Sequence, residues 1–291
     1  MRWEDFRASD NVEDRRGMGG VPGGAGGLGM GAVIILGLIG WALGIDPRIL
    51  ISGAEMVTGG GGGYEQPQQR GQQGAPQDEA GRFAAKILGN TEDVWKAVLP
   101  AQANKQYAAP KMVLFSDRTR SGCGAAQSAM GPFYCPLDQT VYIDLSFFQE
   151  MQRRFKAGGD FAHAYVIAHE VGHHVENQLG ILPRVQQRQQ EVSEVERNQL
   201  SVRVELMADC LAGVWAHHSN QRWQSLEQGD IEEAIRAAEA IGDDRLQKQS
   251  QGRVVPDSFT HGSSEQRMRW LTTGLKTGQV QACDTFRASK L

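Results

Sequence analysis

The apolar and polar positions of this chain change character along its length, and each change predicts a different kind of element. Residues 27–45 carry no charged side chain, and as a helix rising about 1.5 Å per residue they just cross a hydrocarbon layer ~30 Å thick. A buried core helix and a cleaved signal peptide are the alternatives. The long polar segment before the run, and the charged Asp46 and Arg48 after it, favour an uncleaved span. The sequence therefore predicts one transmembrane helix over residues 30–52.

The polar stretch that follows, residues 53–79, is rich in Gly, Gln and Pro and contains almost no large apolar side chains. Such a segment cannot bury enough apolar surface to fold, so we expect a flexible linker. A chain of 291 residues has room for one large domain, which we expect over residues 80–291, with residues 1–29 forming a separate N-terminal tail.

Within residues 80–291 the periodicities indicate a mainly helical domain with a small sheet. Residues 81–107 predict two helices separated by a turn at Gly89–Asn90, while residues 111–116 and 140–148 predict strands. Later segments follow helical spacing and carry capping or stop residues: 160–180, 185–220 with a break near Ser193 or Asn198, 230–241 and 264–273. The predicted fold class is α+β.

The numbers and positions of the charged residues exclude one class of partner and predict the orientation of the transmembrane helix. The chain carries 30 Lys and Arg against 34 Asp and Glu, and the basic residues form no cluster, so nucleic acid is not an expected partner. Four arginines precede the apolar run and only Arg48 follows it closely. This predicts a single-pass protein of the inner (cytoplasmic) membrane, with its N-terminus in the cytoplasm and residues 80–291 outside. Gly40 and Gly44 have the spacing of a weak homodimer face, although chance is the better explanation in so glycine-rich a helix.

All four cysteines lie after the predicted span, in the part of the chain that we expect to be exported. An even number of cysteines in an oxidising compartment indicates two disulfides, for which three pairings exist. We favour Cys123 with Cys135 and Cys210 with Cys283. A four-cysteine zinc site is the alternative, but the chain has no C-x-x-C pair.

The segment AHEVGHHVENQLG, from Ala168 to Gly180, contains the H-E-x-x-H pattern on a predicted helix. His169 and His173 stand four apart and face the same way, so both can bind one ion. Imidazole nitrogen suits Zn²⁺, which in catalytic sites takes three protein ligands and leaves one position open. Glu170, on the adjoining face, can accept a proton from the attacking water. The pattern therefore predicts a zinc-peptidase site, and an ordinary histidine-bearing helix is the alternative.

A third ligand has to come from another part of the chain, because the positions after the second histidine do not follow the metzincin pattern and the inverted H-x-x-E-H order is absent. In VELMADCLAG, Glu205 has apolar neighbours, which indicate a buried part of the helix. A buried carboxylate without a partner would cost free energy of folding. We therefore favour Glu205 as the third ligand over a solvated surface glutamate, with Glu194 and Glu196 in reserve. Asp209, one turn later, is expected to accept a hydrogen bond from the far nitrogen of a ligand histidine.

Two further groups fit a peptidase. Tyr142 and Ile143 lie in TVYIDL, which we expect to be an edge strand onto which an extended peptide adds its backbone hydrogen bonds; a structural strand on the core side is the alternative. His261, in THGSSEQR, is a candidate for stabilising the oxyanion of a tetrahedral intermediate, and capping or packing the following helix is the alternative.

Four segments together closely resemble the bacterial putative neutral zinc metallopeptidase family: AHEVGHHVENQLG, VELMADCLAG, GPFYCPLDQTVYIDLSFF and FTHGSSEQR. The similarity extends over nearly the whole chain. The resemblance implies a gluzincin-like zincin fold preceded by a membrane span, with His169, His173 and Glu205 as zinc ligands and Glu170 as catalytic base. It implies no particular substrate.

These observations predict a membrane-anchored zinc metalloendopeptidase that hydrolyses peptide bonds of extracytoplasmic proteins, with Zn²⁺ as cofactor and a protein or peptide as substrate. A catalytically weak adaptor or assembly factor of the cell envelope, which keeps the zincin fold for binding, is the alternative from a different class. A zinc amidase acting on cell-wall peptides would use the same residues.

Overall fold

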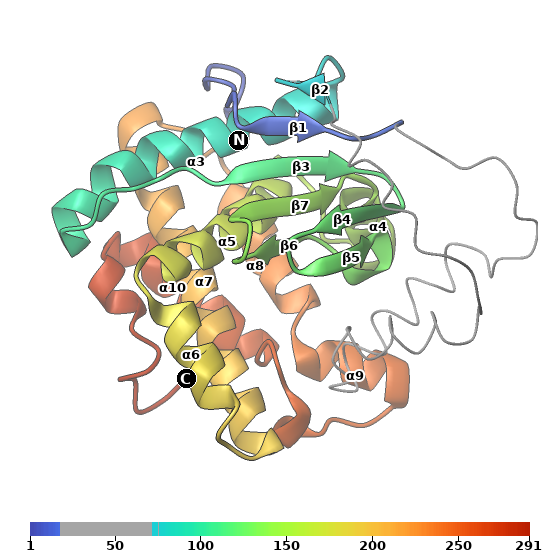
Figure 1. The fold of residues 1–291 in the computed structure, drawn as a ribbon, viewed down its shortest axis with the longest axis vertical. Helices are drawn as coiled ribbons and strands as arrows, with labels where there is room; N and C mark the ends of the chain where they lie inside the picture. Colours follow the sequence, from blue (N-terminus) through green and yellow to red (C-terminus); the bar gives the residue numbers. More distant parts are fainter. Residues whose placement is uncertain (18–71, 75) are drawn as a thin grey trace, which may run out of the picture.

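The computed structural model describes residues 1–17, 72–74 and 76–291, so the span predicted over residues 30–52 and most of the predicted linker lie outside the described residues. Among the described residues, no helix combines the length and the hydropathy that a membrane crossing requires. The described part is mainly helical with a small sheet (Figure 1), which is the predicted α+β class.

The central sheet has the strand order β2-β1-β3-β7-β6. Three strands in its middle are parallel, namely β1 (Val12–Asp14), β3 (Lys111–Phe115) and β7 (Thr140–Asp144). An antiparallel strand lies at each edge, namely β2 (Gln72–Gln73) and β6 (Phe133–Cys135). A separate antiparallel hairpin consists of β4 (Arg118–Ser121) and β5 (Gly124–Gln127). Both strands predicted from the sequence are therefore present, as β3 and β7.

The helices lie mainly after the sheet strands in the sequence. In chain order they are α3 (Glu79–Ala103), α4 (Ser146–Phe155), α5 (Asp160–Gln178), α6 (Ile181–Gln189), α7 (Glu194–Trp223), α8 (Asp230–Ala240), α9 (Asp243–Gln251) and α10 (Ser264–Thr277). α5 contacts β6 on one side and α7 on the other, and Figure 1 shows α6, α7 and α10 grouped beyond it, away from the sheet.

The turn predicted at Gly89–Asn90 is wrong, because α3 continues through both residues. A Cβ atom at Gly89 would overlap the carbonyl oxygen of Arg7, so the glycine allows the N-terminal segment to approach the helix backbone closely. Asn90 is buried and accepts a hydrogen bond from Nε1 of Trp215 at 2.8 Å. Gly89 and Asn90, which suggested a turn, therefore lie inside a helix and make contacts with distant segments of the chain.

Residues 1–17, expected as part of a separate tail, lie on the domain predicted over residues 80–291. β1 pairs with β3 in parallel, and the backbone N–H of Ser9 donates to Ala85 of α3 at 2.9 Å. The carboxylate of Glu92, which is 2% exposed, accepts hydrogen bonds from Ser9 Oγ at 2.6 Å and from Asn11 Nδ2 at 2.7 Å. The N-terminal segment is therefore a structural part of this domain.

The helix boundaries after the H-E-x-x-H segment follow local capping signals. Gly180, with φ 72°, separates α5 from α6, and Pro183 lies in the first turn of α6, where its missing N–H costs no helical hydrogen bond. Ser193 caps α7 in a reciprocal capping box with Glu196. The break predicted near Ser193 or Asn198 is thus the start of α7 at Ser193.

Two disulfides tie distant segments to this framework. Cys123 is bonded to Cys135, which joins the loop of the β4–β5 hairpin to the edge strand β6. Cys210 of α7 is bonded to Cys283, which ties the C-terminal segment to that helix across 73 residues of sequence. These are the two pairs that the sequence favoured.

Candidate metal centre

Two histidines of α5 lie side by side at the contact between α5 and α7. The ring centroids of His169 and His173 are 4.8 Å apart, as expected for residues one helical turn apart. At the same level, a Cβ atom on Gly172 would lie 2.9 Å from the carbonyl oxygen of Ala208. The glycine therefore lets α7 pack directly against the face of α5 that carries the two imidazoles.

This close packing brings Glu205 of α7 to both histidines. Its Oε2 atom is 3.1 Å from Nε2 of His169, and its Oε1 atom is 3.5 Å from Nε2 of His173. The three side chains offer one ligand atom each, all within 4.8 Å of one another. Two imidazole nitrogens and one carboxylate form a donor set that catalytic zinc sites use. The residues present therefore fit a zinc ion.

Each of these two histidines is held by a buried carboxylate at Nδ1. Nδ1–H of His169 donates to Asp209 at 2.8 Å, and Nδ1–H of His173 donates to Glu176 at 2.8 Å. Both carboxylate side chains are 0% exposed. These hydrogen bonds fix the tautomer that leaves Nε2 available to a metal.

Asp209 is itself the centre of a buried network. It accepts hydrogen bonds from the hydroxyl of Tyr165 at 2.5 Å and from the guanidinium of Arg267 at 2.8 and 2.9 Å. Arg267, on α10, is 2% exposed, so its charge is almost completely removed from water. The orientation of His169 therefore depends on residues from three helices, α5, α7 and α10.

Burial and charge act in opposite directions on the ligands. Burial disfavours a charged imidazole, but the charge and hydrogen bond of Asp209 outweigh it and raise the pKa of His169 to about 9. Burial likewise opposes the charge of Glu205, yet the positive field of His173 and His261 holds the pKa of that carboxyl well below its usual range. The buried carboxylates around the two histidines therefore favour positive charge at this site, and a divalent cation also brings positive charge.

Glu170 is the acid of the H-E-x-x-H segment and is 7% exposed. Burial raises the pKa of its carboxyl above the ordinary value, and the nearby His169 and His173 limit this increase. A carboxyl group with a raised pKa takes up and releases protons closer to neutral pH than an exposed glutamate does.

His261 lies on the loop before α10, where Asp243 organises the backbone. One oxygen of Asp243 accepts hydrogen bonds from the backbone N–H groups of Thr260 at 2.8 Å, His261 at 2.7 Å and Gly262 at 3.0 Å. A Cβ atom at Gly262 would lie 3.1 Å from Leu206, so this loop packs on α7 directly beside Glu205. The Nδ1 atom of His261 lies 3.3 Å from the second oxygen of Asp243.

The edge-strand prediction for Tyr142 and Ile143 is wrong. β7 pairs with β3 on one side and with β6 on the other, and the two residues are 3% and 0% exposed. The alternation of apolar and polar residues in this segment predicts a strand, but it does not indicate which strands pair with it. The edge on this side of the described sheet belongs to β6.

Three functional candidates were missed in the sequence. Glu176 stands three residues after His173, a spacing that places both on one helix face, and this was the one local signal available. Arg267 and Asp243 contact the site only through tertiary packing. Since long polar side chains at helix surfaces are usually solvated, nothing in the local sequence distinguished these two.

Comparison with known proteins gives three results. The family model described as "Putative neutral zinc metallopeptidase" matches residues 1–286. "Uncharacterized protein YpfJ" of Escherichia coli K12 is 50% identical over 299 aligned positions, covering 99% of this chain and 100% of that protein. "Uncharacterized protein Rv2575" of Mycobacterium tuberculosis H37Rv is 42% identical over 262 positions, covering 86% of this chain and 85% of that protein. No solved structure matches.

Proposed function

The chain belongs to the putative neutral zinc metallopeptidase family, and on that premise we propose that it is a membrane-attached zinc endopeptidase that cleaves extracytoplasmic proteins. Zn²⁺ is the cofactor that the family implies. The observation that carries the proposal is the convergence of His169, His173 and Glu205, with Glu170 on the same helix as the two histidines.

When bound by these three residues, Zn²⁺ supplies a Lewis acid for the scissile carbonyl and for the attacking water. Glu170 takes the proton of that water and transfers it to the leaving amine, for which its raised pKa is suited. His261 is held by Thr260 and Asp243, whose side-chain oxygens lie 2.8 and 3.3 Å from its Nδ1. When the hydroxyl of Thr260 donates to Nδ1, the ring proton is on Nε2, which would donate a hydrogen bond to the oxyanion formed from the scissile carbonyl. Asp209 and Glu176 keep the two ligand imidazoles in place throughout.

The edge strand β6 is the natural place for an extended substrate. Its Tyr134 hydroxyl lies 2.9 Å from Nδ1 of His174 and accepts a hydrogen bond from Asn177 at 3.0 Å, which fixes β6 alongside the helix that carries the ligands. A peptide that adds its backbone hydrogen bonds to β6 would therefore run alongside α5, the helix that carries His169 and His173. The Cys123–Cys135 disulfide holds the end of this strand.

The test is cleavage of an unfolded protein, β-casein, by the purified full-length protein and by its Glu170→Gln variant. We expect the variant to lose cleavage and to retain zinc in elemental analysis, because Glu170 is not a ligand. The matched control is Glu232→Gln on the exposed surface of α8, which should cleave normally. Bound zinc without turnover on casein or any other unfolded protein would instead support the adaptor, and hydrolysis restricted to muropeptides would support an amidase.

For the location, we propose that the catalytic body lies outside the cytoplasm. Two disulfides support this, because disulfides persist in oxidising compartments and are rare in the cytosol. The position of the N-terminal segment also supports a membrane topology. β1 precedes residues 18–71 in the sequence and β2 follows them, and the two strands pair in one sheet. We therefore propose that the N-terminus and the catalytic body lie on the same side of the membrane, in place of the predicted cytoplasmic N-terminus.

This topology is tested by placing single cysteines at exposed positions in cells and labelling them with a membrane-impermeant maleimide. Asp10 reports the N-terminal segment and Lys290 reports the body, and both are exposed. Equal labelling of Asp10→Cys and Lys290→Cys in intact cells is expected. Labelling of Lys290→Cys alone would instead support the predicted topology, in which the chain crosses the membrane once and its N-terminus is cytoplasmic.

A further inference from the structure

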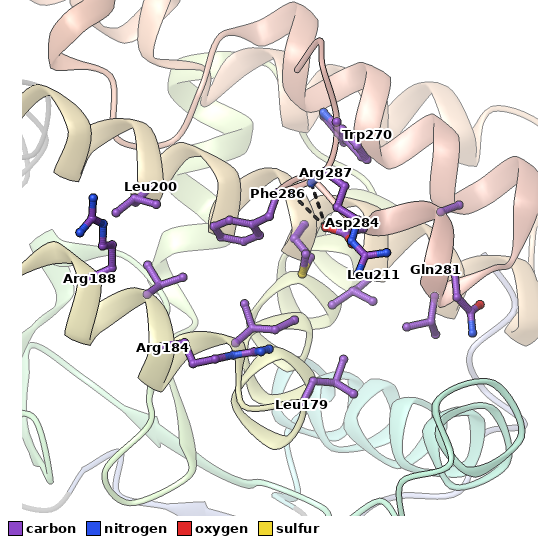
Figure 2. A pocket seen from close by; sticks show the side chains of 16 residues that line it. Leu179, Arg184, Arg188, Leu200, Leu211, Trp270, Gln281, Asp284, Phe286 and Arg287 are labelled. Atoms are coloured by element: carbon purple, nitrogen blue, oxygen red, sulfur yellow. Dashed lines mark hydrogen bonds and ion pairs between the residues drawn. The ribbon is translucent and has the colours of Figure 1, made fainter. Parts of the chain in front are cut away.

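A large, mainly apolar pocket lies beside α7 (Figure 2). Its volume is about 870 Å³, and it is lined by residues of α6, α7, α10 and 280–288 together with Leu179. Met207 and Leu211 of α7 line it, while Glu205 and Asp209 occupy the alternate positions of the same helix. Residues two apart on a helix point to nearly opposite sides, so one helix separates this pocket from the ligands.

The wall formed by the C-terminal segment is fixed to α7. The Cys210–Cys283 disulfide connects the two, and Thr285 Oγ1 donates a hydrogen bond to the carbonyl oxygen of Arg203 at 2.6 Å. The opposite wall is α6, which the short connection at Gly180 joins directly to α5. The pocket is therefore present without any rearrangement, as is usual for small-molecule sites.

The pocket is apolar inside and basic at its rim. Arg184, Arg188 and Arg287 are exposed members of its lining. Arg287 pairs with Asp284 and Arg188 with Glu191, each at 3.3 Å. Arg184 uses only its Nε–H for Gly180 at 2.9 Å, and no acidic side chain of the described residues pairs with it. Figure 2 shows Arg184 extending from its helix toward the middle of the pocket.

We propose that this pocket binds a long-chain fatty acid, with its acyl chain on the apolar floor and its carboxylate on the guanidinium of Arg184. The planar guanidinium matches a carboxylate in geometry and charge. A pocket of this volume is of the size that takes one drug-sized ligand, and burial of the chain against Leu200, Leu211 and Phe286 supplies the affinity.

A peptide fits this pocket less well than an acyl chain does. A peptide segment brings a backbone N–H and C=O at every residue, and each would be costly to bury without a partner. The interior offers few partners: the side chain of Gln281 already donates to the carbonyl oxygen of Gln102, and most other lining residues are aliphatic or aromatic. The indole N–H of Trp270 is the one buried donor in the described lining without a partner, and it could satisfy a single carbonyl group of a peptide. A hydrocarbon chain has no such groups to satisfy.

The experiment uses the purified full-length protein in a detergent-free, polymer-stabilised form and a palmitic acid analogue that carries a photoreactive diazirine on its chain. After illumination, the crosslinked peptides are identified by mass spectrometry. We expect crosslinks within residues 179–188 and 280–288, removed by excess palmitate but not by excess hexadecanol, which lacks the carboxylate. Arg184→Gln should reduce the crosslinking about tenfold, since it removes a charge-assisted pair, and Arg184→Lys should restore much of it.

Two further variants make the result specific. Arg253→Gln removes an exposed arginine outside the pocket and should leave crosslinking unchanged. Ala288→Phe fills the pocket from the C-terminal wall and should abolish crosslinking, and its thermal unfolding midpoint shows whether it folds. Crosslinks spread over the surface, equal competition by hexadecanol, or full labelling of Arg184→Gln would each overturn the proposal. Stronger competition by phosphatidylglycerol vesicles or by an apolar peptide would overturn the fatty acid as the ligand.

Discussion

Replacing Arg267 by methionine is expected to lower the free energy of unfolding by about 3–5 kcal/mol, the usual cost of leaving one buried charge without its partner. The guanidinium of Arg267 and the carboxylate of Asp209 are joined by two hydrogen bonds, at 2.8 and 2.9 Å. Their exposed fractions are 2% and 0%, so water cannot replace the lost partner. Methionine fills a similar volume, so the decrease in the free energy of unfolding reflects the unpaired charge of Asp209 more than a loss of packing.

The effect should also appear in the titration of Asp209. Burial alone would raise the pKa of this carboxyl, but Arg267 and His169 hold it down to about 2. Without Arg267, the pKa of Asp209 rises, and the carboxyl takes up a proton at a higher pH. Neutralising Asp209 as well should recover part of the stability, because no unpaired charge then remains.

The assay is urea unfolding of chelator-treated protein, followed by circular dichroism, for Arg267→Met, Asp209→Asn and the double variant. The matched control is Arg236→Met, which removes an exposed arginine of α8 and should change stability by no more than about 0.5 kcal/mol. The reasoning fails if Arg267→Met is as stable as this control, or if the double variant loses the sum of the two single losses.

Three other predictions test neighbouring parts of the structure. Glu176→Gln removes the charge beside Nδ1 of His173 and should weaken zinc binding about 10–100-fold in competition with a chromogenic chelator; unchanged affinity would contradict its positioning role. Burial lowers the pKa of His174 from 6.5 to about 4, so the unfolded chain takes up the proton first as pH falls, and the free energy of unfolding should drop by up to about 3 kcal/mol across that range. His174→Gln should lack this part of the pH dependence in urea titrations at each pH. Gly89→Val places a side chain against the carbonyl of Arg7 and should make residues 1–16 sensitive to limited proteolysis, while Ala101→Val, at an exposed position of the same helix, should not.

The candidate metal ligands were predictable because their geometry is mostly local. The spacing of His169 and His173 alone puts both imidazoles on one face of α5. The prediction of Glu205 needed one further argument, namely that a carboxylate among apolar neighbours needs a partner. In the structure, Glu205 lies beside both histidines. Asp209 followed from its position one turn later on the same helix.

The unpredicted parts all depend on contacts between distant segments. β1 has three residues and pairs with a strand about a hundred residues later, so the local sequence carries almost no signal for it. β6 is equally short, and its place beside β7 decides which strand has the free edge. Gly89 resembled a turn because glycine breaks helices on average, while its actual use is to admit a neighbouring backbone.

The position of α7 sets the ligand geometry, and small residues determine that position from both sides. On the α5 side, a Cβ atom at Gly172 would lie 2.9 Å from the carbonyl oxygen of Ala208, and on the α10 side a Cβ atom at Gly274 would overlap the carbonyl oxygen of Cys210. Backbone atoms cannot move aside as a flexible side chain can, so a methyl group at either glycine must displace the helix itself. At Gly172 that displacement separates Glu205 from both histidines, although no ligand has changed. Zinc affinity should therefore depend on Gly172 as much as on Glu176, and the α5–α7 contact belongs to the metal centre as fully as the hydrogen bonds that hold its histidines.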